Sequence, residues 1–151
     1  MRFILIDRIL ELHPDQSAIG VKNVTMSEDF LAHHFPHRPI MPGVLIVESM
    51  VQLADWLIRA SSEFTRMGQA TAFDRIKFRN VVRPGDQMKV KVSLTSHQGN
   101  LASFNGKAYV DDKLAASANF TLTVEPIDPY ITSEEAQKLF RMMSPIEETV
   151  T

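Results

Sequence analysis

The sequence predicts an α+β protein in which one long buried helix is followed by an antiparallel sheet. From Gly43 to about Arg59 or Glu63 the residues are apolar nearly all the way round, which is typical of a helix buried on most sides. Downstream, stretches of alternating apolar and polar residues are separated by turn-forming clusters, and this pattern predicts consecutive antiparallel strands. A helical layer packed on a sheet follows from these two observations.

The strands are bounded by turn signals such as those at 13–17, 80–85, 97–100 and 111–113. In the expected strand from Gln87 to Ser96, the residues Met88, Val90, Val92 and Leu94 alternate on one face. The first two strands are expected to form a hairpin. The expected strands are Phe3–Leu12, Ala18–Val24, Thr71–Arg79, Gln87–Ser96, Leu101–Val110 and Leu114–Val124.

The remaining segments are expected to connect these elements. Ser27 is a candidate cap for a short helix before the long one. Residues 62–69 are expected to form the helix end and a connection. We expect a domain over residues 1–125 and a tail over residues 126–151, in which a capping signal at Thr132 starts a short helix to about Met142. The end, 145–151, is expected to fray.

Length and composition exclude several classes of protein. At 151 residues and 17.1 kDa, with 44% hydrophobic and 23% charged residues, the chain is expected to form one globular domain. A net charge of −2 argues against nucleic-acid binding by bulk electrostatics. The chain has no cysteine, which excludes disulfides and thiolate catalysis. No signal peptide or membrane span is expected, so we predict a cytoplasmic protein.

A proline-rich loop leads into the long helix and is a candidate functional segment. Pro36, Pro39 and Pro42 stiffen this loop, because each fixes its own φ and disfavours the α region for the residue before it. Pro42 is expected in the first helical turn, where its missing N–H has no partner to lose.

Residues suited to proton transfer flank this loop. His34 is the side chain best suited to accept a proton near neutral pH. Glu48 lies on the apolar helix, one turn from Gln52, and burial tends to raise the pKa of such a carboxyl group so that it can act as an acid. The helix start at Gly43 and Val44 offers backbone N–H groups for a developing oxyanion. The sequence therefore predicts an acid–base site here.

The segment from His34 to Gln52, HFPHRPIMPGVLIVESMVQ, closely resembles the active-site signature of the β-hydroxyacyl-acyl-carrier-protein dehydratases of type II fatty acid synthesis. The segments 5–9 (LIDRI) and 21–24 (VKNV) resemble the first strands of that family. A further match lies at 76–87, where the chain is similar to the family's strand-and-turn motif. The resemblance extends from about Phe3 to about Val124.

This resemblance implies a hot-dog fold, in which a curved sheet wraps the central helix. It implies a homodimer with active sites at the interface, often assembled further into hexamers. The implied substrate is a 3-hydroxyacyl thioester, carried on the phosphopantetheine arm of acyl-carrier protein, and no metal or redox cofactor is implied. By this analogy, His34 of one subunit works with Glu48 of its partner.

The resemblance also implies a role for each residue of the site. His34 would remove the α-proton, while the carbonyl oxygen of Ile40 would hold the other ring nitrogen and fix the tautomer. Glu48 would protonate the departing hydroxyl group, and Gln52 would orient Glu48. The backbone N–H of Gly43 would bind the thioester carbonyl oxygen. The residues expected to contact the acyl chain are Phe35, Met41, Pro42, Val44, Met50 and Trp56.

Basic residues after the helix are candidates for docking the acidic carrier. Arg75, Lys77 and Arg79 alternate along one expected strand and are predicted to share a face, which is either a solvated surface or a docking surface. On the helix, Asp55 and Arg59 are expected to form an ordinary solvated pair.

Several alternatives stay open at this point. A metal site formed by His33, His34 and His37 is disfavoured, because no carboxylate supports them and Pro36 restricts the loop. The family usually has glycine at the position of His37, so the loop either does without a positive φ there or is shaped differently. Other possible functions are an acyl thioesterase, an enoyl hydratase and a non-catalytic module that binds acyl-carrier protein.

Overall fold

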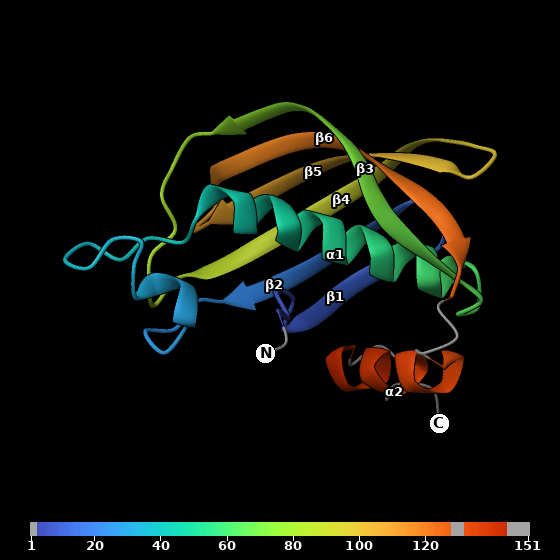
Figure 1. Ribbon diagram of the computed structural model, residues 1–151, viewed down its shortest axis with the longest axis horizontal. Helices are drawn as coiled ribbons and strands as arrows, with labels where there is room; N and C mark the ends of the chain where they lie inside the picture. The colour runs from blue at the N-terminus through green and yellow to red at the C-terminus, as the bar shows by residue number, and fades with distance from the viewer. Residues whose placement is uncertain (1–2, 128–131, 145–151) are drawn as a thin grey trace.

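A six-stranded antiparallel sheet curves round a long helix, α1, in the computed structural model, which describes residues 3–127 and 132–144 (Figure 1). The strand order β1-β2-β4-β5-β6-β3 leaves β1 and β3 at the two edges. The predicted α+β class is therefore confirmed. The elements are β1 (Arg8–His13), β2 (Ser17–Asn23), the 3₁₀ helix η1 (Asp29–Leu31), α1 (Gly43–Ser61), β3 (Arg66–Phe78), β4 (Gln87–Gln98), β5 (Leu101–Val110), β6 (Lys113–Pro126) and α2 (Ser133–Met143).

The core lies between α1 and the concave face of the sheet. The inward-facing residues of β4, among them Val90 and Val92, are fully or almost fully buried, as the alternation in the sequence predicts. The helix approaches β5 so closely that a Cβ on Gly106 would lie 2.7 Å from the sulfur atom of Met50. A glycine is therefore needed at this crossing, and it lets the Met50 side chain fill the core.

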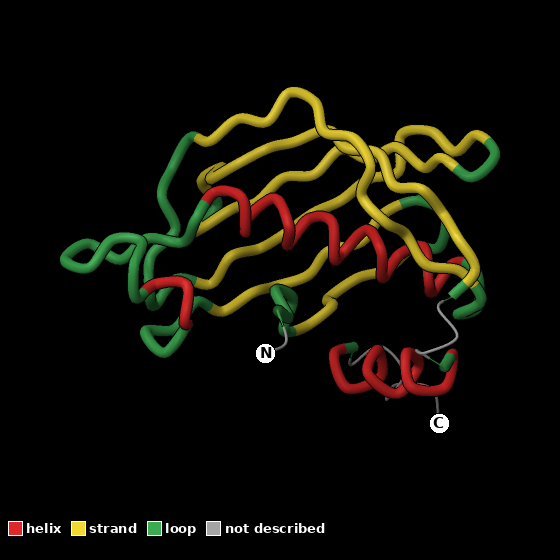
Figure 2. The backbone as a smooth tube through the Cα atoms, viewed as in Figure 1, coloured by secondary structure: helices red, strands yellow, loops and turns green. Residues whose placement is uncertain are grey.

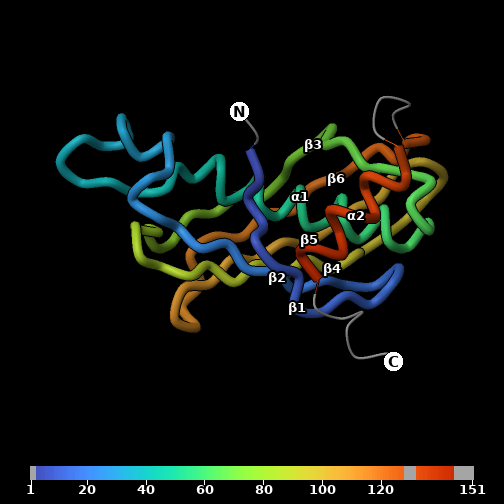
Figure 3. Tube along the Cα trace, turned by 90° about the horizontal axis from the view of Figure 1, so that it is seen from below, coloured from blue at the N-terminus to red at the C-terminus, as the bar shows by residue number. Residues whose placement is uncertain are grey.

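Segment 3–7 and helix α2 cover the side of α1 that the sheet leaves open (Figure 3). The backbone N–H of Leu5 donates to the side chain of Gln52 on α1, and Leu5 is buried there. The prediction of a strand from Phe3 to Leu12 is therefore wrong in its first half, because these residues pack on the helix and β1 begins only at Arg8. On α2, the ring of Phe140 contacts Trp56.

Strand β3 begins earlier than the sequence predicts. The segment 62–69 was expected to be a connection, but β3 starts at Arg66 and pairs with the end of β6. A tight turn with positive φ at Glu63 and Phe64 reverses the chain immediately after α1. The Arg-Met-Gly-Gln sequence of this segment has no β-branched residue, so its strand character comes from pairing and not from local propensity.

Asp55 and Arg59 form a buried pair, which corrects the expectation of a solvated one. Arg59 is only 8% exposed, and its Nε lies 2.9 Å from Asp55 Oδ2. The other carboxylate oxygen accepts the backbone N–H of Gly68 at 2.7 Å, so the pair joins the end of α1 to the start of β3. Burial raises the pKa of Asp55, and the Arg59 guanidinium and the Gly68 N–H oppose that rise.

The loops at 24–42 and 79–86 lie together at one end of the molecule (Figure 2). The turn at 83–86 is tied to the end of β2, since Gly85 N–H donates to the carbonyl oxygen of Val24. In the first loop η1 has no side-chain cap, because Glu28 occupies the N-cap position and the hydroxyl of Ser27 bonds to that of Thr25 instead. The predicted Ser27 cap is therefore wrong.

Helix α2 is capped by Thr132, whose hydroxyl accepts the Glu135 N–H. The predicted short helix is thus present, and the segment expected to fray, 145–151, lies outside the described residues. Within the parts of the chain that the structure describes, no helix has both the length and the apolar character needed to cross a bilayer.

Candidate active site

His34 lies in a hydrogen-bonded loop that precedes the N-terminus of α1. Its Nδ1 lies 3.0 Å from the carbonyl oxygen of Ile40, while Ile40 N–H donates to the carbonyl oxygen of His34 at 2.9 Å. Between them, Phe35 and Arg38 exchange backbone hydrogen bonds, and the Phe35 ring stacks on the imidazole. With Nδ1 bonded to a carbonyl oxygen, the proton resides on Nδ1 and Nε2 is the basic atom of neutral His34.

The start of α1 carries two backbone donors that bind nothing within the described chain. Pro42 is the N-cap residue and Gly43 the first helical residue, so the expectation that Pro42 lies inside the first turn is wrong. The Pro42 carbonyl oxygen accepts from Leu45 and Ile46, whereas the N–H groups of Gly43 and Val44 have no acceptor among the described residues. Such free N–H groups at a helix N-terminus favour a negative charge.

Phe78, at the end of β3, lies directly over this helix start. A Cβ built on Gly43 would lie 2.6 Å from Cε1 of the Phe78 ring. Glycine at position 43 therefore permits the close approach of β3, in addition to offering its N–H. Phe78 itself is 55% exposed in the single chain.

Glu48 is positioned by a chain of hydrogen bonds that begins in segment 3–7. The Gln52 side-chain amide donates to Glu48 Oε1 at 3.2 Å and to the carbonyl oxygen of Phe3 at 2.9 Å. Its own carbonyl oxygen accepts from Leu5 N–H at 2.8 Å, which fixes the orientation of the amide. Glu48 is half-buried, and it makes no hydrogen bond to His34 within one chain.

The residues expected to contact an acyl chain fall into two groups. Phe35 and Val44 are exposed, Val44 at 72%. Met41 and Met50 are buried in the core, and Trp56 packs against Phe140. Pro42 lies between these groups, half-buried at the helix start.

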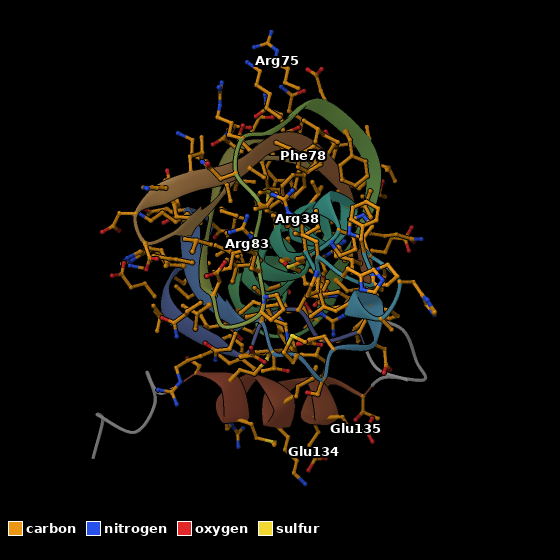
Figure 4. The ribbon with its side chains drawn as sticks, turned by 90° about the vertical axis from the view of Figure 1, so that its left-hand side faces the viewer. Arg38, Arg75, Phe78, Arg83, Glu134 and Glu135 are labelled. Atoms are coloured by element: carbon orange, nitrogen blue, oxygen red, sulfur yellow. The ribbon has the colours of Figure 1, made fainter. Side chains whose placement is uncertain are left out.

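Arg75, Lys77 and Arg79 do not share one face, and Arg79 follows the last residue of β3. The pairing of Asp74 with Asn119 and of Lys77 with Ser117 leaves an extra residue in β3, and Arg75 takes a positive φ there. This bulge reverses the alternation, so the predicted common face is wrong. In Figure 4, Arg75 points outward at the top of the molecule, while Arg38 and Arg83 project nearer the middle of the same end.

Comparison with known families agrees with this geometry. The FabA-like domain model matches residues 1–119. The chain belongs to the FabA-like family. It is 44% identical over 124 residues to the 3-hydroxyacyl-[acyl-carrier-protein] dehydratase FabZ of Rhizorhabdus wittichii, covering 80% of this chain and 79% of that protein. It is also 44% identical over 126 residues to the FabZ of a Thermoanaerobacter species, covering 82% and 89%.

Solved structures of low sequence identity show the fold of this FabA-like protein. The smu.793 protein of Streptococcus mutans, bound to acetyl CoA, superposes with a TM-score of 0.65 at 13% identity, covering 83% of this chain and 93% of that one. The dehydratase heterocomplex ApeI:P from Xenorhabdus doucetiae gives 0.58 at 19% identity, covering 75% and 92%. The predicted hot-dog fold is confirmed.

The histidines near the site do not gather in this FabA-like protein. Among the described residues, no group of three or more His, Asp or Glu side chains is arranged to hold a metal ion. His37 does not take a positive φ, so histidine replaces the usual glycine without backbone strain of that kind.

Two features of the site were not found from the sequence. Phe78 was seen only as part of a strand motif, and its contact with Gly43 depends on the register of the sheet edge. The support of Gln52 comes from backbone atoms of Phe3 and Leu5, which no side-chain pattern reveals. The unexpected turn of segment 3–7 onto the helix is what creates this support.

Proposed function

We propose that this FabA-like protein removes water from a 3-hydroxyacyl thioester, carried on acyl-carrier protein, to give the trans-2-enoyl thioester. The observation that carries this proposal is the position of His34, with its tautomer fixed, on the loop that leads directly to free N–H groups at Gly43 and Val44. A base beside an oxyanion site is what proton removal next to a thioester carbonyl requires.

The proposed mechanism balances without any redox change. Nε2 of His34 takes the proton from C2, and the electrons of that C–H bond form the new double bond as the C3–O bond breaks. Glu48 gives its proton to the departing hydroxyl group, which leaves as water. The Gly43 N–H binds the carbonyl oxygen, where negative charge develops. This chemistry needs no redox cofactor and no metal.

Two chains are proposed to build each site. No hydrogen bond joins His34 to Glu48 within one described chain, and β3 is an edge strand with one side unpaired. Such an edge, when it carries exposed apolar residues, favours pairing with a second strand. We infer a homodimer in which β3 strands pair and His34 faces the partner's Glu48; assembly into hexamers and a cytoplasmic location stay predictions. The exposed apolar residues of the edge include Phe73, Ile76 and Phe78.

The acyl chain is proposed to lie on the exposed residues Phe35 and Val44 and on the half-buried Pro42. Met41, Met50 and Trp56 are left out of this surface, because contacts within the chain already cover them. The unit over residues 1–125 is proposed to carry the whole function, while within the tail over 126–151 helix α2 supports α1 through the contact of Phe140 with Trp56.

The carrier is proposed to dock on the exposed basic residues at the same end of the molecule: Arg38, Lys77, Arg79 and Arg83. An acidic carrier is attracted by such a cluster, which mainly raises the association rate. Replacing Arg79 and Arg83 by Glu should raise KM for the carrier-bound substrate about tenfold. A pantetheine surrogate should show little change, and Arg75→Glu is the matched control because Arg75 points elsewhere.

The first test follows enoyl-thioester absorbance with a 3-hydroxyacyl thioester, with a thiol reagent in parallel. His34→Ala and Glu48→Gln should each lose at least about 100-fold in kcat, whereas His97→Ala, at a distant hairpin, should keep full activity. Release of thiol instead of enoyl product would make the protein a thioesterase. Binding of the carrier with no turnover would leave a non-catalytic module.

A mixing experiment tests the shared site. If His34 and Glu48 of different subunits act together, co-refolding the two inactive variants restores about a quarter of the wild-type activity, because hybrid dimers keep one intact site. If each site lies within one chain, the mixture stays inactive.

A further inference from the structure

Lys22 is a buried lysine on the inner side of β2. Its side chain is only 7% exposed, and its Nζ lies 2.8 Å from Glu28 Oε1 and 3.7 Å from Asp7 Oδ2. Lysine is almost never buried in this way unless its charge is paired. Of its two carboxylate partners, Glu28 is half-buried, with its side chain 23% exposed, and Asp7 is more exposed, at 38%.

The two carboxylates belong to the two segments that position the proposed acid and base. Asp7 ends segment 3–7, whose backbone holds Gln52 and, through Gln52, Glu48. The same Asp7 oxygen accepts the backbone N–H of Asn23 at 2.7 Å, which fixes the carboxylate on β2.

Glu28 stands at the start of η1, on the segment that leads to His34. Its carbonyl oxygen accepts the N–H of Leu31 at 3.0 Å, and the Leu31 side chain is buried. The direction in which the chain leaves η1 therefore depends on where Glu28 is held. Lys22 is the charged group that holds it.

We propose that Lys22 is a positioning residue for the reaction. Its ammonium group contacts Asp7, on the segment that holds Gln52 and Glu48, and Glu28, on the segment that leads to His34. Lys22 thereby fixes the positions of Glu48 and His34 relative to β2. This inference rests on the proposed function, in which His34 and Glu48 act on one substrate. In the proposed dimer, each Lys22 would position the base of one site and the acid of the other.

The chain provides a matched control in the Asp55–Arg59 pair. That pair is also buried, and it also joins two elements, but it lies at the other end of α1 and connects to β3 at Gly68. Removing the cation of either pair should weaken folding. Only the removal of Lys22 should lower kcat.

The experiment compares Lys22→Met and Arg59→Met in the full chain, at a temperature well below the Tm of both. Misplacing reacting groups by about 1 Å can cost on the order of 100-fold in rate, so Lys22→Met should lose about tenfold to 100-fold in kcat with little change in KM. Lys22→Arg should restore much of the rate. Arg59→Met should keep kcat within about twofold.

NMR of the His34 ring supplies a second readout. In the wild type and in Arg59→Met, the Nδ1–H tautomer bonded to Ile40 should dominate; in Lys22→Met its signals should broaden or shift. If Lys22→Met does not fold, Glu28→Gln removes the same ion pair at a half-buried position and should give the same loss of kcat.

The proposal is overturned if Lys22→Met and Glu28→Gln keep kcat within about twofold, or if Arg59→Met loses as much as Lys22→Met. The His34→Ala and Glu48→Gln variants run alongside. If those two keep their activity, the proposed function is what fails; if they are inactive while Lys22→Met is fully active, only the role of Lys22 fails.

Discussion

Gly43→Ala tests whether the contact of β3 with the helix start is part of the site. The added Cβ would lie 2.6 Å from Phe78 Cε1, whereas ordinary contact begins at 3.4 Å, so the ring or the helix must move by most of an ångström. Overpacking of this kind costs about 1 to 3 kcal/mol. Because the Phe78 ring is half-exposed and able to swing outward, we expect a cost of about 1 kcal/mol.

The same substitution has the opposite effect when the ring is absent. Gly43 does not take a positive φ, and alanine favours the helix over glycine by up to about 1 kcal/mol. In a Phe78→Ala background, Gly43→Ala should therefore be neutral or stabilising. The sign of the effect on the free energy of unfolding should reverse between the two backgrounds.

Urea unfolding and enoyl-forming kinetics on the four proteins of this cycle measure both effects. Because the Gly43 N–H is the proposed oxyanion donor, Gly43→Ala alone should also lower kcat, by about tenfold or more. That loss should be largely absent when Phe78 is already alanine. An equal loss of stability and rate in both backgrounds would refute the reasoning, because the damage would then arise from the helix start itself.

Other predictions concern the polar residues of α1. Arg59→Met leaves the carboxylate of Asp55 buried without its partner, so it should cost about 3 kcal/mol and lower the Tm by about 10 °C in a thermal scan. Burial raises the pKa of Asp55, so ionisation of this carboxyl group opposes folding. The stabilisation by protonated Asp55 is therefore fully present below the unfolded pKa and is lost as the pH rises through the folded pKa. The stability of wild type relative to Asp55→Asn, measured by urea unfolding, should thus fall as the pH rises above the ordinary carboxyl pKa of 3.8; an unchanged difference would contradict the assigned burial. Gln52→Met removes the donor to Glu48 and should lower kcat about tenfold, with KM largely retained. A loss confined to KM would mean that Gln52 contacts substrate instead.

The features that sequence predicted well are those set by local pattern. The apolar character of α1 and the alternation of β4 reflect burial on a fixed side, and the structure places both where expected. The His34–Ile40 contact was expected only from the resemblance to the dehydratase family, and the structure contains it. Over such short stretches of sequence, few backbone conformations are compatible with the pattern.

The features that sequence failed to predict depend on distant contacts. Asp55 and Arg59 were predicted to be a solvated pair because their i, i+4 spacing is common on helix surfaces. In the structure, Gly68 at the start of β3 donates to Asp55 and helps to bury the pair. Segment 3–7 has the composition of a strand and is drawn onto α1 by Gln52. The bulge at Arg75 arises from pairing with β6, and the sequence does not show that register.

The position of Phe78 connects subunit pairing to the oxyanion site. Its ring covers Gly43 from the last residue of β3, which is the edge proposed to meet a second copy. In a single chain the ring is half-exposed, so its outer side is open to solvent. A paired edge would hold β3, and with it the ring, against the helix start. Dimer formation would then do more than bring Glu48 to His34: it would also set the geometry of the Gly43 N–H, so a monomeric variant should lose activity even toward substrates that need no acid.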